Sequence, residues 1–277
     1  MTRSVIVCNF THETSLAKFE TTLNLNRYFI KLAYDGTRYH GWQMQRNART
    51  LQQVLDDACS LILREPVKLT GCGRTDAGVH AREFFAHFEI EPRLSFDERQ
   101  NLVYKLNSFL DSDIAVYDMF PVKPKVHARF SALARTYHYI ITRYKNPFSV
   151  NHSYCLYSNL DVDMMNKGAS FLLDVNDFTS FSKVNTDTKT NICRVTYANW
   201  EQNMNELVFR IRADRFLRNM VRAIVGTLLE LGTGKITFDE FRQVVASKNR
   251  SDAGESVPAA GLFLFSVDYP PGLILDH

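Results

Sequence analysis

Residues 73–81 have the sequence GRTDAGVHA and lie between a short apolar run, residues 67–69, and an aromatic run, residues 84–88. This pattern predicts a loop between two strands. Arg74 and Asp76 are two residues apart, so an extended backbone places both side chains on one face. A neighbouring arginine favours the ionised carboxylate, which can act as a nucleophile. The same residues could instead form an Asx-type turn closed by a surface ion pair.

The composition is that of a globular protein that can bury a sizeable core. The chain has 277 residues, of which 45% are hydrophobic and 23% charged, with a net charge of +3. This length suits one large or two ordinary domains. Residues 121–160 contain no Asp or Glu but several basic residues, which are Lys123, Lys125, Arg129, Arg135, Arg143 and Lys145. Such a block favours a polyanionic partner, although a solvated face or an interdomain linker has the same pattern.

The cysteines and histidines give no sign of a disulfide framework or a metal centre. Five cysteines are scattered along the chain without a Cys-x-x-Cys pair, which favours a reducing compartment. His80, His87 and His127 lack metal-ligand spacing, and no glycine-rich nucleotide-binding motif occurs. No apolar run approaches the roughly 20 residues of a membrane span, and the first residues are too polar for a signal peptide. We therefore expect a cytoplasmic protein without metal or cofactor.

The first half of the chain predicts the element order βαββαβ. Alternating apolar residues indicate strands, and capped amphipathic segments indicate helices. Thr50 caps the first helix, and Ser95 with Glu98 forms a capping box for the second. In order, the expected elements are a strand at 27–34, a helix at 51–63, strands at 67–69 and 82–90, a helix from 95 to 109 and a strand at 114–120.

The second half predicts a similar order. Asp161 is expected to cap a helix, Gly232 to end one, and Thr237 with Glu240 to form a capping box. The expected elements are a strand at 135–143, a helix at 161–173, a hairpin at 192–200 and 207–211, helices at 215–231 and 237–246, and a strand at 261–268.

This repeated order predicts an α+β fold of two ferredoxin-like, RRM-like halves, whose antiparallel sheets form a central RNA-binding cleft. The expected divisions are an N-terminal extension (1–26, with a short strand at 4–10), a first domain (27–124) and a second domain (125–277).

An arginine-rich helix and a strand tyrosine are further candidates for binding. On a helix at 215–231, Arg215, Arg218 and Arg222 fall within about 60° of arc. Guanidinium groups there suit phosphates or a buried carboxylate, although solvated arginines on an amphipathic helix fit equally. Tyr137, two residues after Arg135, could stack under a flipped base or be an ordinary core tyrosine.

Several motifs resemble the tRNA pseudouridine synthase A family. The signature GRTDAGVH at residues 73–80 is joined by matches along nearly the whole chain from residue 28. These are YDGTRYHGWQMQ at 34–45, ARFSA at 128–132, RTY at 135–137, DFTSF at 177–181, FLRNMVRAIVG at 216–226 and PAAGL at 258–262. In the 34–45 motif, Tyr39 and Trp42 offer stacking surfaces, or are core aromatics beside a turn.

The resemblance implies a cofactor-free isomerase that converts uridine to pseudouridine at positions 38, 39 and 40 of the tRNA anticodon arm, and a homodimer. Asp76 would be the catalytic residue, held ionised and positioned by Arg74 and Arg222. Tyr137 would stack on the uracil and is a candidate to accept the C5 proton. Substrate phosphates would be bound by the other arginines, namely Arg129, Arg135, Arg215 and Arg218.

Two other functions use the same features. A non-catalytic RNA-binding protein would keep the basic and aromatic residues, but it gives no reason for the Arg-x-Asp loop. An enzyme acting on free nucleosides or nucleotides would leave the basic surface unused. Activity on tRNA that depends on Asp76 distinguishes the family reading from both.

Overall fold

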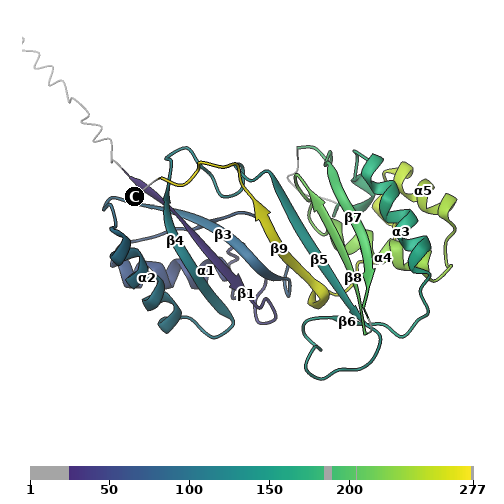
Figure 1. Ribbon diagram of the computed structural model, residues 1–277, viewed down its shortest axis with the longest axis horizontal. Coiled ribbons are helices and arrows are strands. Elements are labelled where there is room, and N and C mark those ends of the chain that lie inside the picture. Colours follow the sequence, from purple (N-terminus) through teal and green to yellow (C-terminus); the bar gives the residue numbers. More distant parts are fainter. Residues whose placement is uncertain (1–24, 184–188, 204, 276–277) are drawn as a thin grey trace, which may run out of the picture.

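A single mixed sheet runs through the computed structural model, which describes residues 25–183, 189–203 and 205–275. The strand order is β4-β1-β3-β9-β5-β8-β7, with β2 beside β3 and β6 beside β5. Most neighbours are antiparallel, and the exceptions are β3 with β9 and β5 with β6. The fold is therefore α+β with a mostly antiparallel open sheet (Figure 1). No helix in the described part of the chain is long and apolar enough to cross a membrane.

The N-terminal half, residues 26–122, has the predicted order βαββαβ. Its elements are β1 (Asn26–Tyr34), α1 (Leu51–Leu63), β2 (Thr70–Gly71), β3 (His80–Ile90), α2 (Phe96–Phe109) and β4 (Ile114–Val122). Thr50 caps α1, and the Ser95–Glu98 capping box opens α2, as predicted. The strand predicted at residues 67–69 is wrong, because only Thr70 and Gly71 pair with β3.

The C-terminal half, residues 134–268, places three helices beside its part of the sheet. Its strands are β5 (Ala134–Thr142), β6 (Tyr154–Cys155), β7 (Val195–Gln202), β8 (Glu206–Ala213) and β9 (Leu262–Asp268). Its helices are α3 (Val162–Phe171), α4 (Met220–Gly232) and α5 (Phe238–Ser247). Short 3-10 turns lie at Leu172–Asp174, Thr179–Phe181, Arg250–Asp252 and Ala259–Gly261. Asp161 caps α3 and the Thr237–Glu240 box opens α5, as predicted.

The arginine-rich helix begins later than the sequence predicts. α4 starts at Met220, and Asn219 before it has a left-handed backbone with φ of 65°. The Asp214 carboxylate accepts hydrogen bonds from the backbone N–H groups of Arg194 and Arg215, which holds this segment in a turn after β8. Arg215 and Arg218 therefore precede the helix. Gly232 is the last helical residue rather than the one beyond the cap, and the positive φ falls at Gly234.

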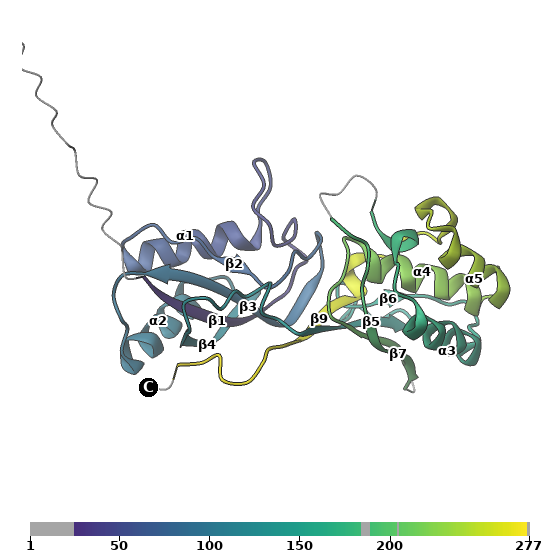
Figure 2. The same ribbon diagram turned by 90° about the horizontal axis from the view of Figure 1, so that it is seen from above.

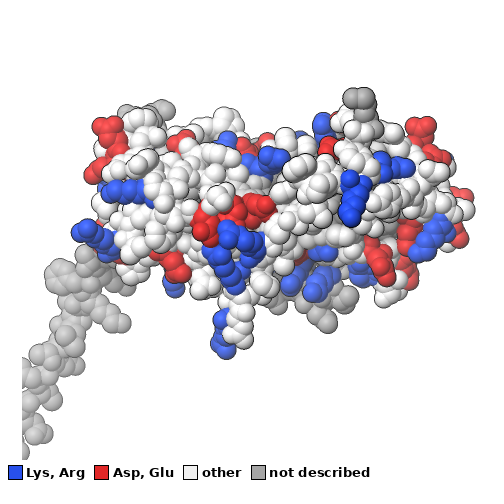
Figure 3. Space-filling model, turned by 90° about the horizontal axis from the view of Figure 1, so that it is seen from below, with Lys and Arg blue, Asp and Glu red and all other residues white. Residues whose placement is uncertain are grey.

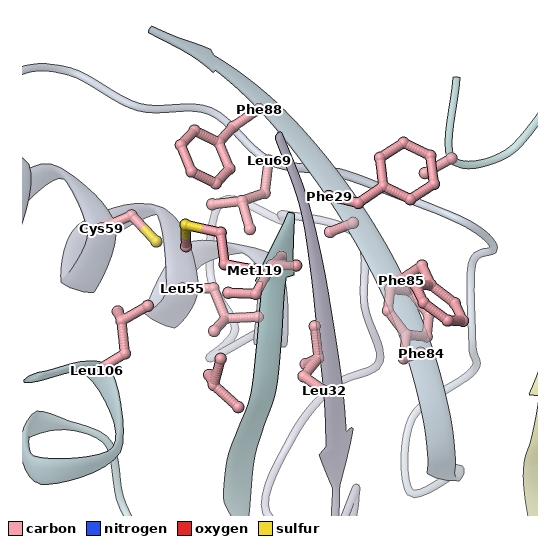
Figure 4. Close-up of a cluster of buried hydrophobic side chains, with 14 of the residues drawn as sticks. Phe29, Leu32, Leu55, Cys59, Leu69, Phe84, Phe85, Phe88, Leu106 and Met119 are labelled. Atoms are coloured by element: carbon pink, nitrogen blue, oxygen red, sulfur yellow. The ribbon is translucent and has the colours of Figure 1, made fainter. Parts of the chain in front are cut away.

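Two hydrophobic cores lie at the two ends of the sheet, and β3, β9 and β5 connect them (Figures 1 and 2). Figure 4 shows part of the N-terminal core, where Leu55 and Cys59 of α1 face Leu32 and Met119 from the strands. The cores share the centre of the molecule, because the ring of Tyr137 packs against both. Residues 1–24 of the predicted extension, including its strand at residues 4–10, lie outside the described residues, and Asn26 already belongs to β1.

Candidate active site

The loop that carries Asp76 is held in place by residues 34–45. The Tyr34 hydroxyl and Thr75 Oγ1 form a buried hydrogen bond of 2.8 Å. The backbone N–H of Trp42 donates to the Thr75 carbonyl at 3.2 Å, and the Gly78 N–H donates to the Tyr39 carbonyl at 3.2 Å. Three bonds therefore surround Asp76 on both sides and fix the backbone from which its carboxylate projects.

Two glycines allow these segments to approach so closely. A Cβ on Gly36 would lie 2.0 Å from the Val79 carbonyl oxygen, and a Cβ on Gly41 would lie 2.4 Å from that of Thr75. Gly41 also has a φ of 84°, a conformation that other residues rarely adopt. The aromatic residues of the same motif belong to the core, since Tyr39 and Trp42 are each only 2% exposed. The interpretation of their rings as stacking surfaces is therefore wrong.

The Asp76 carboxylate faces two arginines of the C-terminal half. Arg222 Nη1 lies 3.7 Å from Asp76 Oδ2, and Arg218 Nε lies 3.9 Å from Asp76 Oδ1. Arg222 is partly buried and donates from Nε to the Val257 carbonyl at 2.7 Å, whereas the Arg218 side chain is 60% exposed. At both distances the guanidinium and the carboxylate attract each other, but both distances are longer than a hydrogen bond. The carboxylate is thus held in a positive field with its oxygens open to a further partner.

Arg74 contributes to a second group of positive charges beside the loop. The pKa of Arg129 is lowered by burial and then by the nearby guanidinium groups of Arg74, Arg135 and Arg215. Among the described residues, Asp76 forms its ion pairs with Arg218 and Arg222 rather than with Arg74. The exposed Arg74 instead adds its charge to the group of Arg129, Arg135 and Arg215. Four mutually repelling cations suit an anionic ligand.

Arg135 uses its guanidinium to connect backbone segments. Nη1 donates to the carbonyls of Ala132 and Asp214, and Nη2 donates to those of Cys72 and Arg129. These contacts tie the Asp76 loop and the turn after β8 to the segment that precedes β5. Arg135 therefore orders the site, while Arg129 and Arg215 supply nearby charge.

Tyr137 lies at the junction of the two halves. Its ring packs edge-to-face against Phe216, with ring centroids 5.0 Å apart. Burial raises the pKa of Tyr137 above its ordinary value, and Cys72 and Asp76 act in the same direction. The phenol is therefore neutral near pH 7. A neutral ring is suited to stacking and is poorly suited to removing a proton.

The surface charge is distributed in small groups. On the face seen in Figure 3, Lys and Arg alternate with Asp and Glu across a largely uncharged surface. The local arginine group at the Asp76 loop, rather than the net charge of +3, is therefore the feature that suits a polyanion.

Comparisons with known proteins show the family to which the chain belongs. A tRNA pseudouridine synthase family model matches residues 172–270. The chain is 51% identical over 249 residues to tRNA pseudouridine synthase A of Parabacteroides distasonis, covering 90% of this chain and 98% of that protein. It is 52% identical over 256 residues to the Bacteroides thetaiotaomicron protein of the same name (91% and 94% covered). It is 40% identical over 248 residues to that of a Thermoanaerobacter species (88% and 100% covered).

The chain belongs to the tRNA pseudouridine synthase A family. This confirms the resemblance inferred from the sequence motifs. In this chain, residues 34–45 have a structural role that the sequence motif alone did not reveal. They supply the hydrogen bonds and close glycine contacts that hold the Asp76 loop. Tyr34 and Thr75 are the site residues that sequence reasoning missed, because their partnership joins two segments about 40 residues apart.

Proposed function

We propose that this protein isomerises uridine to pseudouridine at positions 38, 39 and 40 in the anticodon stem-loop of tRNA, with Asp76 as the catalytic residue. The observation that carries the proposal is the Asp76 carboxylate on a fixed loop, facing Arg218 and Arg222 from the other half of the chain. Family membership supplies the reaction class.

The reaction needs no oxidant and no external group. The N1–C1′ bond of uridine breaks, the uracil turns, a C5–C1′ bond forms, the proton leaves C5 and N1 gains a proton. Asp76 would act either as a nucleophile at the sugar or uracil or as a base. Arg222 and Arg218 would position its charge, and the neutral Tyr137 would stack on the flipped uracil.

The tRNA would lie over the arginines around the Asp76 loop. Arg74, Arg129 and Arg215 would bind phosphates, which offsets the few kcal/mol needed to extrude a base. We further propose that two ferredoxin-like domains, residues 27–124 and 125–277, form a central RNA-binding cleft, and that the protein works as a cytoplasmic homodimer. The strand order β4-β1-β3 with β2 beside β3 supports the first of these domains.

The decisive experiment measures tritium release from a tRNA transcript labelled at uridine C5. Formation of the C5–C1′ bond must expel this label. The wild-type protein should release tritium, and Asp76→Ala and Asp76→Asn should lose at least about 1,000-fold in rate. The matched control is Asp174→Asn, which changes an exposed aspartate in the turn Leu172–Asp174 and should keep full activity.

Binding measured in parallel separates the alternatives. Asp76→Asn should still bind tRNA, because the phosphate-binding arginines remain. Tight tRNA binding without tritium release by the wild type would favour a non-catalytic RNA-binding protein. Efficient release from free labelled uridine would favour an enzyme on nucleosides. Full activity of Asp76→Ala would overturn the assignment of the catalytic residue.

A further inference from the structure

A separate group of potential ligands lies beyond the catalytic loop. Asp35 lies in the turn after β1, His80 begins β3, and His152 lies in the connection between β5 and β6, residues 143–153. One ligand atom from each of the three lies within 4.8 Å of the other two. Asp35 Oδ2 is 2.7 Å from His152 Nε2, and Asp35 Oδ1 is 3.1 Å from His80 Nδ1.

The hydrogen bonds of His80 determine which of its nitrogens carries a lone pair. The Gly36 N–H donates to Nδ1 at 3.1 Å, so Nδ1 is the unprotonated nitrogen. Nε2 then carries the proton and donates it to the Ala260 carbonyl at 3.2 Å. The ring also stacks on Phe263, with centroids 4.6 Å apart. His80 is thus held with the Nδ1 lone pair on the Gly36 N–H, beside the Asp35 carboxylate.

This orientation brings two electron-rich atoms together. His80 Nδ1, which carries no proton, lies 3.1 Å from Asp35 Oδ1, and a cation that took the place of the Gly36 N–H would be attracted to both atoms. A histidine that binds a metal through one nitrogen usually donates its other ring N–H to a carbonyl or carboxylate. The His80–Ala260 bond is a contact of this kind.

We propose that Asp35, His80 and His152 bind one divalent transition-metal ion of the Zn²⁺ class, which fastens residues 143–153 of the C-terminal half to the turn after β1. Two imidazoles and one carboxylate are a donor set that suits such ions. Tetrahedral ligands of zinc lie about 3.4 Å apart. The contacts of Asp35 with His152 and His80, at 2.7 and 3.1 Å, would lengthen slightly, and the three ligand atoms already lie within 4.8 Å of one another. The His152 side chain is 45% exposed, which lets an ion approach from solvent.

The test is a Co²⁺ titration of the full, untagged chain after chelator treatment. Binding should produce visible d–d absorption bands, and Zn²⁺ should displace them. His152→Gln should weaken Co²⁺ affinity at least about tenfold, the lower end of the effect of changing even an outer-shell partner. His40→Gln is the matched control, because His40 is another exposed histidine of the same half as Asp35 and should leave affinity unchanged.

Two further measurements separate this site from other binding. A cysteine site, for instance at the partly exposed Cys155, would give a near-ultraviolet sulfur-to-cobalt charge-transfer band. Zn²⁺ should also raise the thermal unfolding midpoint of the wild type but not of His152→Gln or Asp35→Asn, because a ligand that binds only the folded state stabilises it. Equal affinities of wild type and His152→Gln, a thiolate band, or absence of d–d bands would overturn the proposal. None of these readouts depends on pseudouridine formation.

Discussion

The two sides of the candidate active site are built in different ways. On the N-terminal side, hydrogen bonds of 2.8–3.2 Å from residues 34–45 hold the Asp76 loop. On the C-terminal side, Arg218 and Arg222 approach Asp76 only to 3.9 and 3.7 Å, from a turn and from the first turn of α4. The comparison indicates a loop backbone that is fixed before substrate arrives and two cations that face the Asp76 carboxylate without hydrogen bonds to it.

Among the tests of this comparison, the largest expected effect distinguishes Arg222 from Arg218. Arg222→Gln should lower kcat/KM for tRNA by about 100-fold or more, because it removes a partly buried charge fixed beside Asp76. Arg218→Gln should cost less than about tenfold, since exposed ion pairs contribute roughly 0–1 kcal/mol. Steady-state tritium release measures both, and circular dichroism checks the fold. Equal losses would show that the two charges act as one group.

The fixed side of the site can be tested through its glycines. Gly36→Ala places a Cβ 2.0 Å from the Val79 carbonyl, so it should lower the free energy of unfolding by about 3 kcal/mol, the upper end of the usual cost of overpacking. Gly73→Ala, in the Asp76 loop itself, is the control, because no atom outside its chain neighbours lies within 4 Å of the added Cβ. Urea unfolding measures both. Similar stabilities would mean that the close packing of residues 34–45 on the loop is not what fixes it.

Local signals were enough to predict much of this architecture. The capping residues of α1, α2, α3 and α5 were correct, because a cap depends on side chains within three or four positions. The start of α4 was wrong for the opposite reason. Asp214 bonds to Arg194, which is distant in the sequence, and this contact keeps Arg215 out of the helix.

The candidate active site shows the same difference between local signals and contacts between distant segments. The hypothesis that Asp76 is catalytic came from its own motif and stays a prediction, whereas the carbonyls that bind Arg135 come from segments up to 79 residues away. Such a contact leaves no periodic pattern in the sequence, so Arg135 was predicted to bind substrate when its donors are already used by the backbone. For Trp42 the sequence allowed either a stacking surface or a core residue, and its 2% exposure and its stacking on Phe84 place it in the core.

Removal of one hydroxyl group is a smaller perturbation of the N-terminal side of the site. Tyr34→Phe removes the buried bond to Thr75 and should lower the free energy of unfolding by about 1–2 kcal/mol. It should also lower kcat, because the Asp76 loop loses one of its supports. Tyr39→Phe removes a hydroxyl that donates to Asp113 at 2.8 Å, away from the loop. This control should lose stability without a comparable loss of kcat, and a parallel loss in both variants would contradict the role given to Tyr34.

A final expected effect comes from a carboxylate of the same half that forms no ion pair with an arginine among the described residues. Asp56 is 6% exposed and accepts a hydrogen bond from the Leu69 N–H at 2.8 Å, and burial raises its pKa to about 6. Between its ordinary pKa near 3.8 and this value, the folded state holds a proton that the unfolded state has lost. The contribution of Asp56 to stability is therefore most favourable below this window and declines as pH rises through it.

Asp56→Asn keeps an acceptor for Leu69 and removes the buried charge. The variant should exceed the wild type in free energy of unfolding by about 1–3 kcal/mol at pH 8, the upper value being the full conversion of the pKa shift, and this advantage should vanish toward pH 4. Urea unfolding across this range measures it, with Asp174→Asn as the exposed control that shows no such trend. An advantage that grows as the pH falls would mean that the fold stabilises Asp56 as an anion, as expected for a carboxylate that faces arginines. The contrast between Asp76, which faces two arginines, and Asp56 would then fail.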